Sequence, residues 1–111
     1  MEKSNHKNIV IIGHSFGGAV TMHLANQFSE DFENRVRCIL LTDSAHGYAN
    51  TPECIRKVCI NFEASDEPLD TDLGEFNGMI TKSAGHTVHE WTPSTSRPCL
   101  FNYIDKFLSK E

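Results

Sequence analysis

The chain enters its first regular structure through a continuous run of β-branched residues that leads straight into a glycine-rich turn. The run is NIVIIG, residues 8–13, and its lack of polar alternation is typical of a strand buried on both faces of a parallel sheet. The turn GHSFGG follows, and Val20, Leu24 and Phe28 then recur every four residues, which predicts a helix with one apolar face running to about Ser29. A buried strand that passes directly into a helix indicates the α/β class.

The rest of the chain repeats this alternation. The acidic stretch SEDFENR breaks the helical pattern, residues 51–57 predict a short helix, and residues 99–108 predict a closing helix with an apolar face. Three further runs predict strands: 36–42, 58–62 and 78–84. Strands separated by helical or loop crossovers predict about four parallel strands with flanking helices and right-handed connections.

Length and composition bound the class of protein. A chain of 111 residues with 39% hydrophobic residues allows one soluble domain, spanning residues 1–111. The net charge of −5 gives no basic stripe, so we expect no direct nucleic-acid binding. The sequence contains neither a signal-peptide pattern nor a long apolar run, so we expect no membrane insertion and no secretion. The four cysteines lack CxxC spacing, which favours reduced thiols in the core.

The turn carries the clearest chemical signal. Residues 13–17 match G-x-S-x-G between a strand and a helix, which is the context of a nucleophile elbow with Ser15 as the nucleophile. The amide of Phe16, at the start of the helix, is then the expected oxyanion donor. The alternative is that Ser15 simply caps the helix.

A serine nucleophile needs a base and a carboxylate, which this fold presents in the chain order Ser, acid, His. His89 follows the last predicted strand and precedes the last helix, so it is the preferred base, with His86 as its competitor. We expect His14 to pack or to donate a hydrogen bond, and His46 to line the same cleft. A structural role is the alternative for all four histidines.

The predicted acid lies in the loop after the third predicted strand. Asp66, Glu67 and Asp70 rank nearly level there, and each is equally compatible with a solvated loop charge. No HExxH pattern, zinc-finger spacing or GxxxxGK[ST] motif occurs, so we expect neither a metal nor a cofactor.

Several segments together carry a family resemblance. GHSFGG, LLTDSAH, CINF with SDEPLD, and SAGHTVHEWT followed by FNYIDKFL resemble the C-terminal part of the argonaute-binding-protein-two domain, the cotranscriptional regulator family. The resemblance implies a partial α/β-hydrolase fold, with Ser15 at the elbow and His89 as the late histidine, and it favours the segment 67–70 for the acid. It also implies argonaute-type and chromatin-associated partners in the nucleus or the cytoplasm, in small-RNA-directed heterochromatin formation or in coupling chromatin to splicing.

One departure from the family pattern shapes the expected function. In this fold a loop among earlier strands gives the second oxyanion amide, and here only eight residues precede Ile9. Loss of one such donor costs about 10²–10³ in rate, so we expect a truncated, hydrolase-shaped interaction module, with a serine hydrolase acting on an ester or amide as the alternative. Residues 8–13 then form an unprotected sheet edge, which predicts self-association or a partner that adds a strand.

Overall fold

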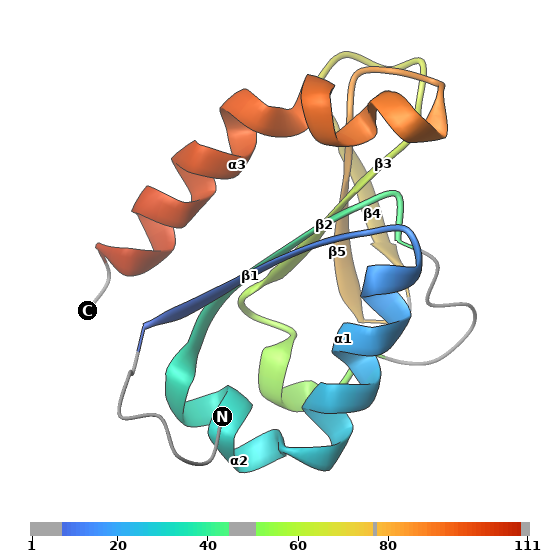
Figure 1. Cartoon of the computed structure of the whole chain (residues 1–111). Coiled ribbons are helices and arrows are strands. Elements are labelled where there is room, and N and C mark those ends of the chain that lie inside the picture. The colour runs from blue at the N-terminus through green and yellow to red at the C-terminus, as the bar shows by residue number, and fades with distance from the viewer. Residues whose placement is uncertain (1–7, 45–50, 77, 110–111) are drawn as a thin grey trace.

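A mixed sheet forms the centre of the molecule (Figure 1). The helices α1 (Phe16–Gln27) and α2 (Ser29–Arg35) lie on one face of the sheet, and α3 (Thr92–Leu108) lies on the other. The structure is a computed structural model that describes residues 8–44, 51–76 and 78–109. Within these residues the strand order is β1-β2-β3-β5-β4, with β4 antiparallel and all other neighbours parallel. The strands are β1 Ile9–His14, β2 Val36–Thr42, β3 Cys59–Glu63, β4 Asp72–Phe76 and β5 Met79–Ser83.

The four parallel strands agree with the sequence prediction to within a residue or two at most ends, and β1 occupies the predicted edge. The fifth strand, β4, was not predicted. Its sequence DLGEF is polar and carries a glycine, and its pairing with β5 contains an irregularity between Asp72 and Gly74. Such composition is unfavourable for a buried strand but suits a solvent-exposed edge. The fold is therefore α/β with a mostly parallel sheet of five strands in the described residues.

The helices α2 and α3 differ from the prediction in their extent. The acidic stretch that was expected to break the pattern forms a helix of its own, α2 Ser29–Arg35. Glu30 and Asp31 occupy its first turn and Arg35 its last, which complements the helix dipole. Phe32 is buried and anchors the helix in the core. The closing helix α3 spans Thr92–Leu108 and so begins earlier than predicted, because Pro93 is compatible with a first helical turn.

The first helix, α1 Phe16–Gln27, packs through a different face from the apolar one read in the sequence. Its buried residues are mostly small: Gly18, Thr21, Met22 and Ala25. Val20 and Leu24 are instead exposed, at 46% and 37%. Small residues bring the helix close to the sheet, and the larger apolar side chains are thereby turned toward solvent.

The sheet separates two apolar cores. One contains Met22, Phe32 and Ile39 with their neighbours under α1 and α2, and the other contains Leu40, Phe62 and Leu100 under α3. All four cysteines are free thiols, as predicted. Burial raises the pKa of Cys38 to about 11 and that of Cys59 to about 12, so both remain protonated at neutral pH. In the described residues, no helix has the length and apolar character needed to cross a membrane.

Candidate active site

The turn between β1 and α1 holds Ser15 in a strained backbone conformation. Ser15 has φ 53° and ψ −116°, a region that non-glycine residues rarely occupy and that costs on the order of 1–3 kcal/mol. Its N–H donates to the carbonyl of Thr42 at 3.0 Å, and its side chain makes no capping hydrogen bond to α1. The alternative reading of Ser15 as an ordinary helix cap therefore has no support in the geometry.

Two glycines allow the close packing around this turn. A Cβ at Gly13 would lie 3.1 Å from the side chain of Leu41 on β2. A Cβ at Gly18 would lie 1.7 Å from Ser44 Oγ and 2.7 Å from Ser44 Cβ, which no real side chain tolerates. Gly17, which completes the sequence motif, has open space at the same position. Gly18, just outside the motif, is thus the residue that lets the end of β2 approach the turn.

The carboxylate that meets His89 belongs to Asp43, directly after β2. Asp43 Oδ2 accepts a hydrogen bond from His89 Nδ1, and Asp43 Oδ1 accepts one from the Ala64 amide at 3.1 Å. The backbone N–H of Asp43 donates to Phe62 O at 2.7 Å, which ties this residue to the end of β3. The Asp43 side chain is 22% exposed and that of His89 41%. Because a carboxylate only accepts hydrogen bonds, Nδ1 carries the proton and Nε2 of the neutral ring remains an acceptor.

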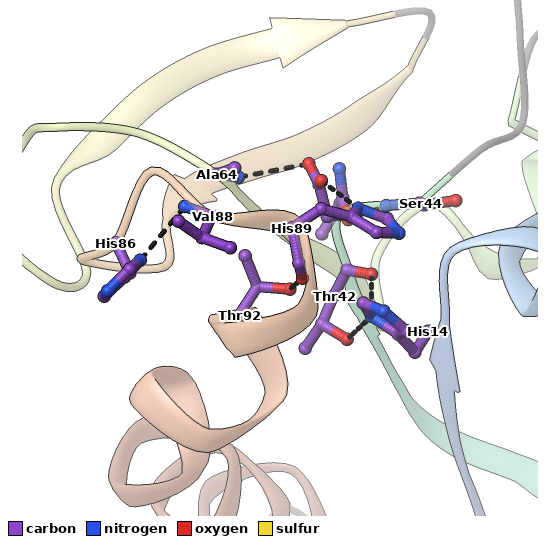
Figure 2. Close-up of polar contacts among 10 residues, drawn as sticks. His14, Thr42, Ser44, Ala64, His86, Val88, His89 and Thr92 are labelled. Atoms are coloured by element: carbon purple, nitrogen blue, oxygen red, sulfur yellow. Dashed lines mark hydrogen bonds and ion pairs between the residues drawn. The ribbon is translucent and has the colours of Figure 1, made fainter.

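His14 connects this pair to the turn. Its ring centroid lies 4.6 Å from that of His89, with the planes tilted by 34°. Its Nδ1 lies 3.0 Å from Thr42 O and 2.9 Å from Thr42 Oγ1, so the carbonyl requires Nδ1 to donate. Figure 2 shows Thr42 holding the His14 ring beside His89, at the carboxyl ends of the parallel strands. His14 therefore has the packing and hydrogen-bonding role that the sequence indicated.

The structure brings Ser15, Asp43 and His89 to one edge of the sheet. The Ser15 amide donates a hydrogen bond to the carbonyl of Thr42, which directly precedes Asp43. The ring of His14, which directly precedes Ser15, lies beside the ring of His89. Among the described residues, Ser15 Oγ makes no direct hydrogen bond to His89. In structures without substrate, hydrogen bonds between catalytic groups are often long or poorly aligned, and they tighten only in the reacting complex.

The three acids named from the sequence lie elsewhere. Asp66 and Glu67 are exposed, and the Glu67 amide donates to Ser65 Oγ within the same loop. Asp70 accepts a hydrogen bond from the Tyr103 hydroxyl at 2.9 Å. None of the three forms a hydrogen bond to His89 in the described part of the chain. The position of Asp43 could have indicated it as a candidate acid, because it directly follows a strand of buried type in the sequence LLTDS.

The remaining predicted site residues are placed as follows. Phe16 is the first residue of α1, with its side chain 71% exposed and its amide at the positive end of the helix dipole. His86 accepts a hydrogen bond from the Val88 amide (Figure 2). Its ring also stacks on that of Trp91, so these contacts of His86 stay within its own segment of the chain. His46 lies outside the described residues. No cluster of three metal-binding side chains occurs among the residues that the structure describes.

Fold and site together define an α/β domain with a strained serine and a carboxylate-bound histidine at the carboxyl edge of a mostly parallel sheet. No protein-family model matches the chain, and no solved structure matches it. Curated proteins do match the chain. The chain is 37% identical to the cotranscriptional regulator ARB2A homolog of Dictyostelium discoideum over 119 residues, which cover 99% of this chain and 31% of that protein.

Vertebrate relatives carry the same name. The ARB2A homolog of Xenopus tropicalis is 32% identical over 97% of this chain and 27% of its own length. Cotranscriptional regulator ARB2A of Homo sapiens is 33% identical over 88% of this chain and 25% of its own length. These matches confirm that the chain is related to the cotranscriptional regulator family, and the chain spans about a quarter to a third of the curated relatives it matches.

Proposed function

We propose that this chain carries a serine-hydrolase-type site within a protein that acts in cotranscriptional regulation. The observation behind the site is the hydrogen bond between Asp43 and His89 next to the strained turn at Ser15. The three residues follow the chain order of an α/β-hydrolase triad, in which serine comes first, the acid second and the histidine last. Asp43 is the acid in this proposal, ahead of Asp66, Glu67 and Asp70, because it is the carboxylate in contact with the base.

The roles follow from the chemistry of each group. Asp43 holds the proton of His89 on Nδ1 and stabilises the imidazolium that forms during the reaction. Nε2 of His89 removes the hydroxyl proton of Ser15, and the oxygen forms a bond to the carbonyl carbon of an ester or amide. The Phe16 amide donates to the resulting oxyanion, supported by the dipole of α1. Protonated His89 then returns its proton to the leaving group, and the acyl group stays on Ser15 until water releases it.

The biological part of the proposal comes from the relatives. They are named cotranscriptional regulators, and the chain spans only part of their length, so partners are inferred from the family. We infer a nuclear location with argonaute-type and chromatin-associated proteins as partners, in small-RNA-directed heterochromatin formation or in coupling chromatin to splicing.

A fluorophosphonate probe, which reacts with activated serines, tests the site. We expect labelling of the purified chain at Ser15 that disappears in Ser15→Ala. Asp43→Asn should lower the labelling rate strongly, because replacing the orienting aspartate of a Ser-His-Asp triad by asparagine lowers kcat by about 10⁴-fold.

Asp66→Asn is the matched control, because it removes the same charge from an exposed carboxylate of the loop after β3. It should label like the native chain. Labelling that is equal in the native chain and in Ser15→Ala, or that falls as much in Asp66→Asn as in Asp43→Asn, would contradict the proposed site.

The regulatory role has a separate test. The chain, carrying an epitope tag, is expressed in cells and precipitated from nuclear and cytoplasmic fractions, and the precipitates are probed with antibodies against an argonaute protein. We expect enrichment in the nuclear fraction and co-precipitation of the argonaute protein, with a scrambled sequence of equal length as the control. If the chain is confined to the cytoplasm and does not co-precipitate the argonaute protein, this part of the proposal is overturned. The proposal for the hydrolase-type site is not affected by that result.

A further inference from the structure

The histidine of the proposed site is held through its backbone and through one edge of its ring. His89 begins the short 3₁₀ helix His89–Trp91, and its carbonyl accepts a hydrogen bond from Thr92 Oγ1 at 2.9 Å. Asp43 accepts a hydrogen bond from Nδ1, at the ring edge, and the His89 side chain is 41% exposed. A hydrogen bond at one ring nitrogen sets the tautomer of an imidazole. It leaves the ring plane free to tilt about that bond.

The ring of His14 supplies a contact of a different kind. The centroids of the His14 and His89 rings lie 4.6 Å apart and their planes are tilted by 34°, within the range of packed aromatic pairs (Figure 2). Rings that meet edge to edge lie farther apart than this, so His14 packs against a face of the His89 ring. This contact opposes the tilting motion that the hydrogen bond to Asp43 leaves open.

The end of β2 fixes His14 itself. The carbonyl oxygen of Thr42 accepts the Ser15 N–H at 3.0 Å and the Nδ1–H of His14 at 3.0 Å, which its two lone pairs allow. Thr42 Oγ1 lies 2.9 Å from the same His14 nitrogen. Thr42 is 1% exposed and directly precedes Asp43. Two consecutive residues of β2 therefore orient the serine turn, the His14 ring and the His89 ring.

We propose that His14 is a positioning residue for His89. It limits the tilt of the His89 ring and so sets where Nε2 lies relative to the Ser15 hydroxyl, whereas Asp43 determines which nitrogen carries the proton. The inference rests on the proposed function, in which Nε2 is the base. His14 acts through His89 and exchanges no proton with the substrate. A misplacement of about 1 Å in a catalytic arrangement costs about 10²-fold in rate, which sets the scale of the expected effect.

Fluorophosphonate labelling of Ser15 gives the first test, at a mildly alkaline pH where ordinary imidazoles are neutral. His14→Ala should lower the labelling rate by about 10²-fold. His14→Phe should recover part of this loss, because it restores a flat ring that cannot donate to Thr42. His23→Ala, which removes an exposed histidine of α1, is the control and should label like the native chain. A His14→Ala chain that labels at the native rate, or a His14→Phe chain no faster than His14→Ala, would overturn the proposal.

Nuclear magnetic resonance of the histidine rings gives a second test that needs no reactive serine. The native chain should show a nuclear Overhauser effect between ring protons of His14 and His89, a result that does not depend on the folding of any variant. Ring ¹³C relaxation should show His89 more mobile in His14→Ala than in the native chain, with its proton still on Nδ1 because Asp43 is retained.

The two tests separate this inference from the proposed function. If Ser15 of the native chain is not labelled, the proposed function fails, and the ring measurements alone decide whether His14 orients His89. Absence of the Overhauser effect, an equally rigid His89 ring in His14→Ala, or loss of the Nδ1 tautomer in that variant would each contradict the role of His14, whatever the labelling shows.

Discussion

The end of β2 and the loop after β3 both present carboxylates near the carboxyl edge of the sheet, yet only the first meets the histidine. Asp43 is held from three sides, by Phe62 O, by the Ala64 amide and by His89. In the loop, Asp66 and Glu67 are exposed, and Asp70 is used by Tyr103. In this chain Asp43 comes beside the serine turn because β2 pairs with β1, whereas the loop that is richest in acids follows β3, one strand further away.

The largest effect should come from the packing that holds the end of β2 in place. Gly18→Ala forces a Cβ into Ser44, next to Asp43, and should lower the free energy of unfolding by about 3 kcal/mol. Gly17→Ala meets open space in the same helical turn and should be neutral or stabilising by up to about 1 kcal/mol. Urea unfolding of both variants measures the difference. Equal stabilities would show that the close approach at Gly18 does not fix the end of β2.

An intermediate effect on the free energy of unfolding should distinguish Asp43 from Asp70. Asp43 and Asp70 both have positive φ, 44° and 73°, so replacing either by alanine adds a similar backbone cost. Asp70→Ala deprives the Tyr103 hydroxyl of its acceptor at an exposed position, whereas Asp43→Ala deprives both the part-buried Ala64 amide and His89 of theirs. The Asp43→Ala change should therefore cost about 1–3 kcal/mol more. Thermal or urea unfolding gives both values. A larger loss for Asp70→Ala would reverse the comparison.

The smallest effect should concern the free energy of unfolding at high pH, through the contact between Tyr103 on α3 and Asp70. Burial, and then the hydrogen bond to Asp70, raise the pKa of Tyr103 above its ordinary value. The folded state therefore holds this proton more tightly than the unfolded state does. Its stabilising contribution is complete below about pH 10, the ordinary tyrosine pKa, and is lost as the pH rises beyond it. Unfolding free energies measured on both sides of that pH should fall less steeply in Tyr103→Phe than in the native chain, and identical slopes would contradict this assignment.

The sequence predicted the elements whose residues have a single strong preference. The runs of Ile, Val and Leu in β1 and β2 specify buried strands, and the turn between β1 and α1 follows from its glycines. The strand β4 could not be recognised because its polar composition is that of a protected edge. The buried face of α1 was misread because Gly18 and Ala25 allow close packing, so the larger Val20 and Leu24 are not needed inside.

For a related reason, the sequence leads to only part of the proposed site. Ser15 and His89 could be proposed because each occupies a defined place between a strand and a helix along the chain, and their roles stay predictions. The acid is specified by neighbourhood in space, since β1 pairs with β2 and the end of β2 thereby comes beside the serine turn. Sequence order alone is compatible with any carboxylate between Ser15 and His89 as the triad acid. A cluster of acids such as that at 66–70 is then the natural prediction.

In the proposed site, Asp43 fixes the ring of His89 with its proton on Nδ1. Long-range ¹H–¹⁵N NMR of the histidine rings reads this tautomer directly, at a mildly alkaline pH where an ordinary imidazole is neutral. The native chain and Asp70→Asn should both show His89 protonated on Nδ1, and Asp43→Asn should lose that preference, because an asparagine side chain can also donate a hydrogen bond. A His89 ring protonated mainly on Nε2 in the native chain, or a tautomer unchanged in Asp43→Asn, would contradict the account.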